Sequence, residues 1–208
     1  YGPLATVVES FMDPGTLIRM HQHRNEEIIS WVPESAMRHD DRQGNELVTD
    51  SDHLMVMNAG SGFWHAEETL ADDPPLRMLQ IFVRPHSLNL EPNIQHEPIP
   101  DSVAGEWRHL FGPEGTDAPL YARNNVDFYD CRLNAGTTTT LPSRPGWHTY
   151  LYAFEGSAKV GNQPVGFTES ALVTGGDDIA VTATEDSTIV AFSIQPDAPV
   201  TRQGTIGR

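Results

Sequence analysis

The stretch RMHQHRNEEIISW, residues 19–31, decides how the rest of the sequence is interpreted. His21 and His23 are separated by one residue and lead into an apolar run. Side chains two residues apart on a β-strand point to the same face, so the two imidazoles would share one face. They are either a metal-binding pair or two surface histidines beside a turn. The choice depends on the partners that the rest of the chain offers.

Composition and charge exclude several classes of protein. The chain has 208 residues, of which 17 are glycine and 16 are proline, and this is typical of a turn-rich globular protein. The formal net charge of -16 repels phosphates, so we expect no direct binding of nucleic acid. One cysteine, Cys131, allows no intramolecular disulfide and suits the cytoplasm. No apolar run approaches the ~20 residues of a membrane helix, and no signal peptide is recognisable.

Short apolar runs, separated by turns, recur along the whole chain. They are EIISWV, HLMVM, LRMLQIFV, VDFYDCRL, HTYLYAF, IAVTAT and STIVAFSI. Several short strands at regular spacing predict an all-β sandwich or barrel. Prolines cluster between residues 84 and 120, which predicts a connecting region with one short helix at residues 103–110.

The two halves of the chain resemble each other. SWVPESAMRHDDRQGN in the first half and LYAFEGSAKVGNQPVG in the second each place a glutamate, Glu34 or Glu155, at a turn between strands. We therefore predict a duplicated β-domain. The expected divisions are a metal-binding domain, a Pro-rich connection, a C-terminal domain without metal and a loose tail, at residues 1–98, 99–119, 120–196 and 197–208.

The segment NAGSGFWHAEET, residues 58–69, supplies partners for the histidine pair. His65 and Glu67 share a face on a strand, so three imidazoles and one carboxylate would converge inside a barrel. This set suits a divalent first-row metal better than calcium or magnesium, and it would be costly to bury without one. Gly60 and Gly62 allow a bend that re-aims the strand.

MHQHRNEEIISWV followed by NAGSGFWHAEE resembles the pirin family, whose members are metal-binding bicupins of the cupin superfamily. The fold that this resemblance implies is all-β, with two jelly-roll-like β-barrels in tandem. LNAGTTTTLPSRPGWHTYLYAFEGSAKVG is similar to the C-terminal cupin of that family, so the resemblance covers nearly the whole chain. The metal ligands that the resemblance implies are His21, His23, His65 and Glu67. The metal ion that the resemblance implies is Fe(II), with Mn, Ni, Cu, Co or Zn as alternatives. The sequence departs from the family at the turn PES, residues 33–35, and its second half has no further H-x-H or H-x-E motif.

Three charged residues near the motif have two interpretations each. Glu67 is either a fourth ligand or a catalytic base that takes a proton from a flavonol hydroxyl, a role implied by the quercetinase activity of pirin-like proteins. Glu27 either contacts a ligand histidine or is a solvated carboxylate of the hairpin. Arg24 either neutralises one of these carboxylates or, as we prefer, is a surface arginine.

The remaining aromatic and sulfur-containing residues are interpreted more simply. Three aromatic residues either line a pocket for an aromatic substrate or, as we prefer, fill the core: Trp31, Phe63 and Trp64. Five histidines are interpreted as lying in polar or Pro-rich turns without a function: His39, His53, His86, His96 and His109. Cys131 is interpreted as a buried apolar residue and not as a nucleophile.

Three functions remain open from the sequence, and it does not decide whether the protein is an enzyme. The first is a quercetin 2,3-dioxygenase-type oxygenase that acts on a small aromatic substrate. The second is a non-enzymatic, metal- or redox-sensitive regulator that binds a protein partner, which the acidic charge would make a basic one. The third is a zinc- or manganese-dependent hydrolase or isomerase on the same fold.

Overall fold

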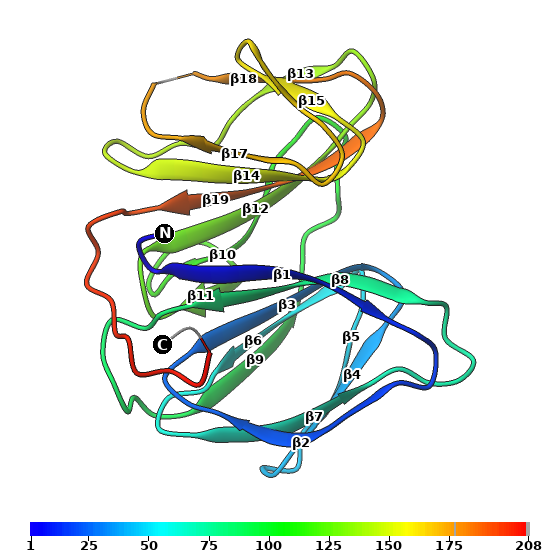
Figure 1. Cartoon of the computed structure of the whole chain (residues 1–208), viewed down its shortest axis with the longest axis vertical. Helices are drawn as coiled ribbons and strands as arrows, with labels where there is room; N and C mark the ends of the chain where they lie inside the picture. The colour runs from blue at the N-terminus through cyan, green and yellow to red at the C-terminus, as the bar shows by residue number, and fades with distance from the viewer. Residues whose placement is uncertain (177, 207–208) are drawn as a thin grey trace.

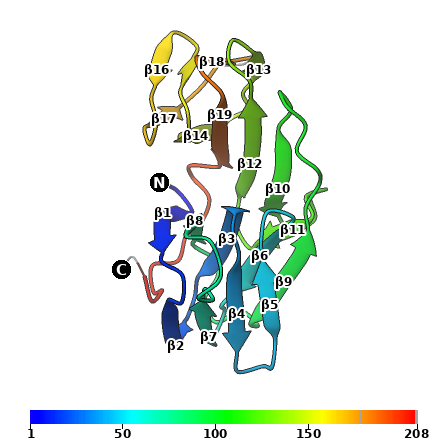
Figure 2. The ribbon, with the colours of Figure 1, turned by 90° about the vertical axis from the view of Figure 1, so that its right-hand side faces the viewer.

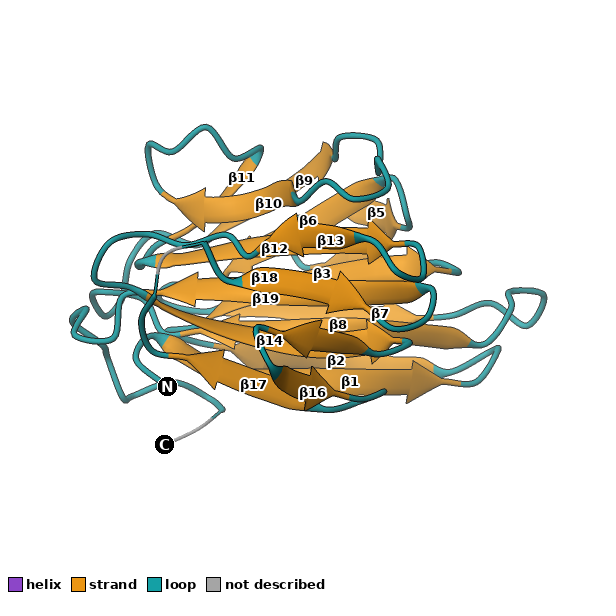
Figure 3. Cartoon of the chain, turned by 90° about the horizontal axis from the view of Figure 1, so that it is seen from above, coloured by secondary structure: helices purple, strands orange, loops and turns teal. Residues whose placement is uncertain are grey.

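The computed structural model describes residues 1–176 and 178–206, and every regular element in them is a β-strand (Figure 3). The predicted all-β class is therefore confirmed. Within these residues no helix is long and apolar enough to cross a membrane. The helix expected at residues 103–110 was wrong, because residues 108–113 pair as a strand in a sheet.

The N-terminal half forms two sheets. The larger has the order β1 (Leu4–Met12), β8 (Leu76–Val83), β3 (Glu27–Glu34), β6 (His53–Asn58) and β9 (Asn93–Pro98). The smaller has the order β2 (Leu17–His23), β7 (Phe63–Glu68), β4 (Met37–Asp41) and β5 (Glu46–Thr49). All pairs in both sheets are antiparallel, and they form a sandwich of the jelly-roll kind.

The C-terminal half repeats this plan. Its larger sheet has the order β11 (Leu120–Ala122), β10 (Arg108–Pro113), β12 (Val126–Leu133), β19 (Ser187–Ile194), β14 (His148–Glu155) and β17 (Ser170–Val173). Its smaller sheet has the order β13 (Thr138–Thr140), β18 (Ala180–Ala183), β15 (Ala158–Val160) and β16 (Gln163–Val165). The order β1-β8-β3-β6 thus recurs as β12-β19-β14-β17, and β2-β7-β4-β5 recurs as β13-β18-β15-β16. The predicted duplication and the bicupin fold are confirmed.

The four sheets stack along the long axis of the molecule, with the two larger sheets in the middle (Figures 1 and 2). The largest apolar cluster lies between these two middle sheets, so the halves share one core. Trp31 of β3 reaches across it, with its ring centroid 6.1 Å from that of Phe128 and 5.0 Å from that of Phe154. Trp31 is therefore core, as preferred. Large shared apolar contacts of this kind hold two domains in one fixed arrangement.

Strand alternation gives β3 two different faces. Ile29 and Trp31 belong to the cluster between the halves, whereas Ile28 and Val32 pack inside the N-terminal sandwich. The hairpin from β3 to β4 closes even though it lacks a glycine. Ser35 adopts a φ of 71° there, and its hydroxyl donates a hydrogen bond to the Pro74 carbonyl at 2.9 Å.

Candidate metal centre

The two sequence motifs lie on neighbouring strands of the smaller N-terminal sheet. β2 pairs with β7 so that His21 lies opposite His65 and His23 lies opposite Phe63. The turn before β7 requires glycine, because Gly60 has a φ of 51° and a Cβ there would lie 2.2 Å from the Leu90 carbonyl oxygen. This bend aims β7 along β2, as the sequence predicts.

Three imidazoles converge at one point inside the sandwich. The ligand atoms of His21, His23 and His65 all lie within 4.8 Å of one another. Nε2 of His21 is 3.0 Å from Nε2 of His23 and 3.1 Å from Nε2 of His65. His65 is fully buried and His23 nearly so, whereas His21 is partly exposed. The cluster therefore opens to solvent on the side of His21.

The hydrogen bonds of the outer ring nitrogens determine the tautomers of His21 and His23. Nδ1 of His21 lies 3.0 Å from the Arg19 carbonyl oxygen, and Nδ1 of His23 lies 2.9 Å from Oε2 of Glu26. A carbonyl or carboxylate oxygen only accepts, so both Nδ1 atoms carry the proton. In the neutral rings, both Nε2 atoms then present a lone pair to the centre of the cluster.

His65 is held in the same tautomer by a chain of two further residues. Its Nδ1 is 3.3 Å from Nδ1 of His39, whose Nε2 is 3.1 Å from Oδ2 of Asp41. Because the carboxylate accepts from Nε2–H of His39, Nδ1 of His39 is left to accept from His65. Burial lowers the pKa of His39, which keeps that ring neutral. His39 is 2% exposed and lies on β4, so its expected place in a turn was wrong.

The surroundings of His65 in the cluster disfavour its protonation. Burial, together with the smaller effects of the neighbouring His21, His23 and His39, lowers the pKa of His65 to about 2. Burial alone would raise the pKa of Asp41, but hydrogen bonds from Asn45, His39 and Gln43 bring it below its usual value. Three lone pairs that face one another within 4.8 Å repel unless a cation lies between them. The donor set therefore fits a divalent first-row metal.

Glu67 lies beside the histidine cluster but is not grouped with it. Its carboxylate is 4% exposed and accepts hydrogen bonds from Nε2 of Gln80 at 2.9 and 3.3 Å. Burial raises the pKa of Glu67, while Gln80 and the nearby His23 act in the opposite direction. Among the described residues, the group whose ligand atoms lie within 4.8 Å contains the three histidines and not this carboxylate.

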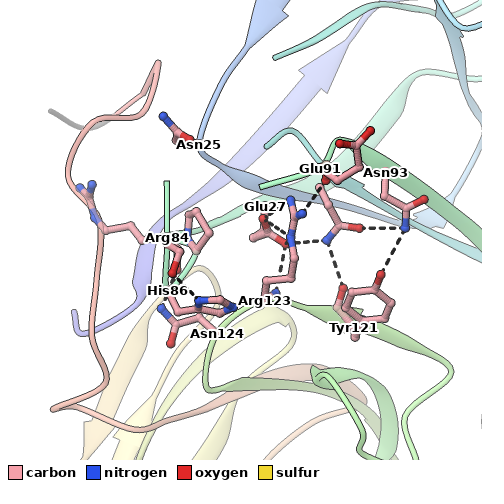
Figure 4. Close-up of polar contacts among 12 residues, drawn as sticks. Asn25, Glu27, Arg84, His86, Glu91, Asn93, Tyr121, Arg123 and Asn124 are labelled. Carbon is pink, nitrogen blue, oxygen red and sulfur yellow. Dashed lines mark hydrogen bonds and ion pairs between the residues drawn. The ribbon is translucent and has the colours of Figure 1, made fainter. Parts of the chain in front are cut away.

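Glu27 has a role that neither sequence interpretation anticipated. It is fully buried and pairs with Arg123 of the C-terminal half, whose Nη2 lies 2.9 Å from Oε1 (Figure 4). The Arg123 backbone N–H and the Asn58 side chain also donate to it. Glu27 thus joins the two halves. Arg24 is exposed and donates to Asn89, so the surface interpretation was correct.

The aromatic residues of the motif lie on opposite faces of β7. Phe63 is buried and packs with Ile28 and Met57, and its ring centroid is 6.2 Å from that of His39. It is core next to the cluster, as preferred. Trp64 points to the outer face, where the Arg42 guanidinium stacks 3.8 Å from its ring. Trp64 is therefore neither core nor part of a pocket at the histidines.

Two tandem sandwiches, with a histidine cluster in the first, define the class of the protein as a bicupin. The family model described as Pirin matches residues 5–83, and the one described as Quercetinase C-terminal cupin domain matches residues 109–194. A pirin-like protein of Caulobacter vibrioides is 30% identical over 192 residues, which cover 91% of this chain and 82% of that protein. The chain belongs to the pirin family.

More distant relatives agree in fold. The quercetin 2,3-dioxygenase of Escherichia coli strain K12 is 19% identical over 196 residues, covering 94% of this chain and 84% of that protein. The crystal structure of the bacterial pirin YhhW from Escherichia coli, in complex with nickel(II), matches with a TM-score of 0.84 at 18% identity. This match covers 94% of this chain and 84% of that one. At this identity the likeness concerns the fold alone.

Proposed function

We propose that His21, His23 and His65 bind one divalent transition metal ion through their Nε2 atoms. The observation that carries the proposal is the convergence of three Nε2 lone pairs, each fixed by an acceptor at the opposite ring nitrogen. Fe(II) is the proposed ion, with Mn, Ni, Cu, Co or Zn as alternatives, since imidazole binds all of them. The nickel(II) complex of the bacterial pirin YhhW supports the binding of a divalent metal ion.

We propose further that the protein is a quercetin 2,3-dioxygenase-type oxygenase of flavonols or similar small aromatic compounds. The named activity of the Escherichia coli relative supports this reaction class. When bound, a divalent ion supplies Lewis-acid polarisation of a substrate oxygen and, if redox-active, reactivity toward dioxygen. The substrate would approach from the side of His21, which is the partly exposed ligand.

Glu67 has a proton-transfer role in this proposal. Its buried carboxylate has a raised pKa, so it binds a proton more readily than an exposed glutamate. Gln80 donates to both carboxylate oxygens and fixes their orientation. In this position Glu67 takes the proton of a flavonol hydroxyl, and the same carboxylate is the alternative candidate for a fourth ligand.

The test combines metal analysis with an assay for oxygen-dependent turnover. Protein purified without added metal is analysed for bound ions, reloaded with Fe(II), and mixed with a panel of flavonols under air. We expect one ion per chain and loss of the flavonol absorbance band only when oxygen is present. Absence of turnover with every metal and every flavonol would refute the oxygenase, and turnover without oxygen would indicate a hydrolase or isomerase instead.

A further inference from the structure

The C-terminal segment folds back onto the turn between β2 and β3. The Arg24 backbone N–H donates to Oγ1 of Thr205 at 2.8 Å, and the Thr205 backbone N–H donates to the Arg24 carbonyl at 3.3 Å. Nδ2 of Asn25 donates to the Gln203 carbonyl at 3.2 Å. Figure 1 shows this segment beside the N-terminal half. The expected loose tail was therefore wrong for residues 203–206, which we call the C-terminal strap.

The strap docks on a turn that is itself fixed. Asn25 adopts a φ of 55°, which asparagine tolerates better than most residues. Its backbone N–H donates to the Gly60 carbonyl at 2.8 Å, and its Oδ1 accepts from the Asn89 backbone N–H at 2.7 Å. The strap therefore contacts a rigid loop that ends at the histidine cluster.

Glu26 connects the strap to the cluster. Its Oε1 accepts a hydrogen bond from the Ile206 backbone N–H, and its Oε2 lies 2.9 Å from Nδ1 of His23. Gly204 lies directly against the same carboxylate, because a Cβ at this position would be 2.7 Å from Oε1. Glu26 is 4% exposed, so little room remains for another orientation. One buried carboxylate thus has two donors, one from the strap and one from a proposed ligand.

We propose that the C-terminal strap is a positioning element for the metal centre and acts on His23 through Glu26. By holding one carboxylate oxygen, the strap fixes the other against Nδ1 of His23 and so directs Nε2 toward the ion. Hydrogen-bond partners of this kind typically change metal affinity by about 10- to 100-fold when removed. The proposal rests on the proposed function in one respect, since it takes His23 to be a ligand.

The test uses Gly204→Ala, which forces the Glu26 carboxylate to move, and a chain ended after Arg202, which removes the strap. Ni(II) is the probe, and its affinity is measured by calorimetric titration of metal-free protein. We expect both variants to bind Ni(II) roughly 10-fold more weakly than the unchanged protein. Arg202→Ala is the matched control, because Arg202 is exposed and next to the strap, and it should leave the affinity unchanged.

A double-mutant cycle separates positioning from a general structural effect. Glu26→Gln keeps the side-chain shape but leaves one oxygen, so it can accept from only one of its two donors. If the strap acts through Glu26, adding Gly204→Ala to Glu26→Gln weakens Ni(II) binding no further. Losses that multiply in the double variant, or unchanged affinity in both strap variants, would overturn the proposal.

A metal-free measurement distinguishes failure of the strap from failure of the metal site. Long-range ¹H–¹⁵N correlation spectra report the tautomer of each histidine ring. We expect His23 to carry its proton on Nδ1 in the unchanged protein and to become a mixture of tautomers in both strap variants. Absence of Ni(II) binding in the unchanged protein would refute the proposed function, whereas an unchanged His23 tautomer in the variants would refute the strap.

Discussion

β2 and β7 occupy the same places in the N-terminal sandwich that β13 and β18 occupy in the C-terminal one. The first pair presents the three histidines to the interior. The second pair carries three threonines on β13, with Val181 and Ala183 of β18 buried in an apolar cluster that also contains Cys131. One strand order thus supports two different interiors. The fold brings the two strands together in both sandwiches. The residues on those strands decide whether the interior beside them is a cluster of polar side chains or an apolar core.

The two sandwiches also differ in the side chains that surround these interior residues. In the N-terminal half, buried Glu26 contacts the outer nitrogen of His23, and the pair His39 and Asp41 contacts that of His65. Within the described residues, the corresponding cluster of the C-terminal half is made of aliphatic side chains from β12, β14, β15, β16, β18 and β19 and of Leu141, together with Cys131. A polar centre in such a fold therefore needs a second layer of acceptors as well as the ligands themselves.

Removing one ligand should have the largest effect and should act on metal binding alone. His65→Ala is expected to abolish stoichiometric Ni(II) binding, because two imidazoles do not hold the ion at the cluster. The matched change in the other interior, Val181→Ala, should leave Ni(II) affinity intact and cost about 2 kcal/mol of unfolding free energy through the cavity it creates. Titration calorimetry measures Ni(II) binding of both variants, and urea unfolding measures their stability. An equal loss of Ni(II) binding in both variants would contradict the difference between the two interiors.

The buried ion pair between Glu27 and Arg123, which joins the two halves, should be the most sensitive point for stability. Arg123→Ala leaves the carboxylate of Glu27 buried without its ion-pair partner, and we expect a loss of about 3–5 kcal/mol in the free energy of unfolding. Arg42→Ala, which removes an exposed guanidinium stacked on Trp64, should cost less than about 1 kcal/mol. Urea denaturation measures the free energy of unfolding of both variants. Similar losses would show that the buried ion pair contributes no more to stability than the exposed stacking contact.

Glu67→Gln should separate the two roles that the sequence leaves open for this carboxylate. If Glu67 is the base, Glu67→Gln should lower turnover of the flavonol by on the order of 100-fold, while the Ni(II) affinity changes by less than about 10-fold. The hydrogen bonds from Gln80 favour this result, because they hold the carboxylate apart from the histidine group. Loss of metal together with turnover would instead make Glu67 a ligand.

The smallest expected effect concerns Cys131 in the apolar interior. Burial raises the pKa of its thiol to about 12, so we expect no reaction with a thiol reagent at pH 8 until the chain unfolds. Because the unfolded thiol ionises near its usual pKa and the folded one does not, unfolding free energy should fall as pH rises above about 9. Cys131→Ala should remove that part of the decline. Rapid labelling of the folded protein would contradict the interpretation.

The cluster of His21, His23 and His65 was predictable from the sequence because it depends on strand parity. His21 with His23, and His65 with Glu67, are each spaced by two residues, and the glycines before β7 mark the bend that aligns the strands. The duplicated all-β fold was predictable for a similar reason, since its apolar runs and turns repeat along the chain.

The remaining parts of the site depend on contacts between distant segments. Glu26 is held by Ile206 of the strap, which lies 180 positions further along the chain. No local sequence pattern predicts a contact between such distant residues. His39 and Asp41 do have the spacing of a strand pair, and that signal could have found them. Glu27 has the parity of the histidines, but Asn25 breaks the strand between them at a φ of 55°, so Glu27 faces the other half.

The most direct test is X-ray absorption spectroscopy at the nickel edge on protein loaded with one equivalent of Ni(II), compared with His23→Ala. The geometry predicts scattering from three imidazoles in the unchanged protein, whereas His23→Ala, with two imidazoles left, should not retain the ion at the cluster. A spectrum without imidazole ligands, or one that His23→Ala leaves unchanged, would show that the converging nitrogens of β2 and β7 do not form the metal centre.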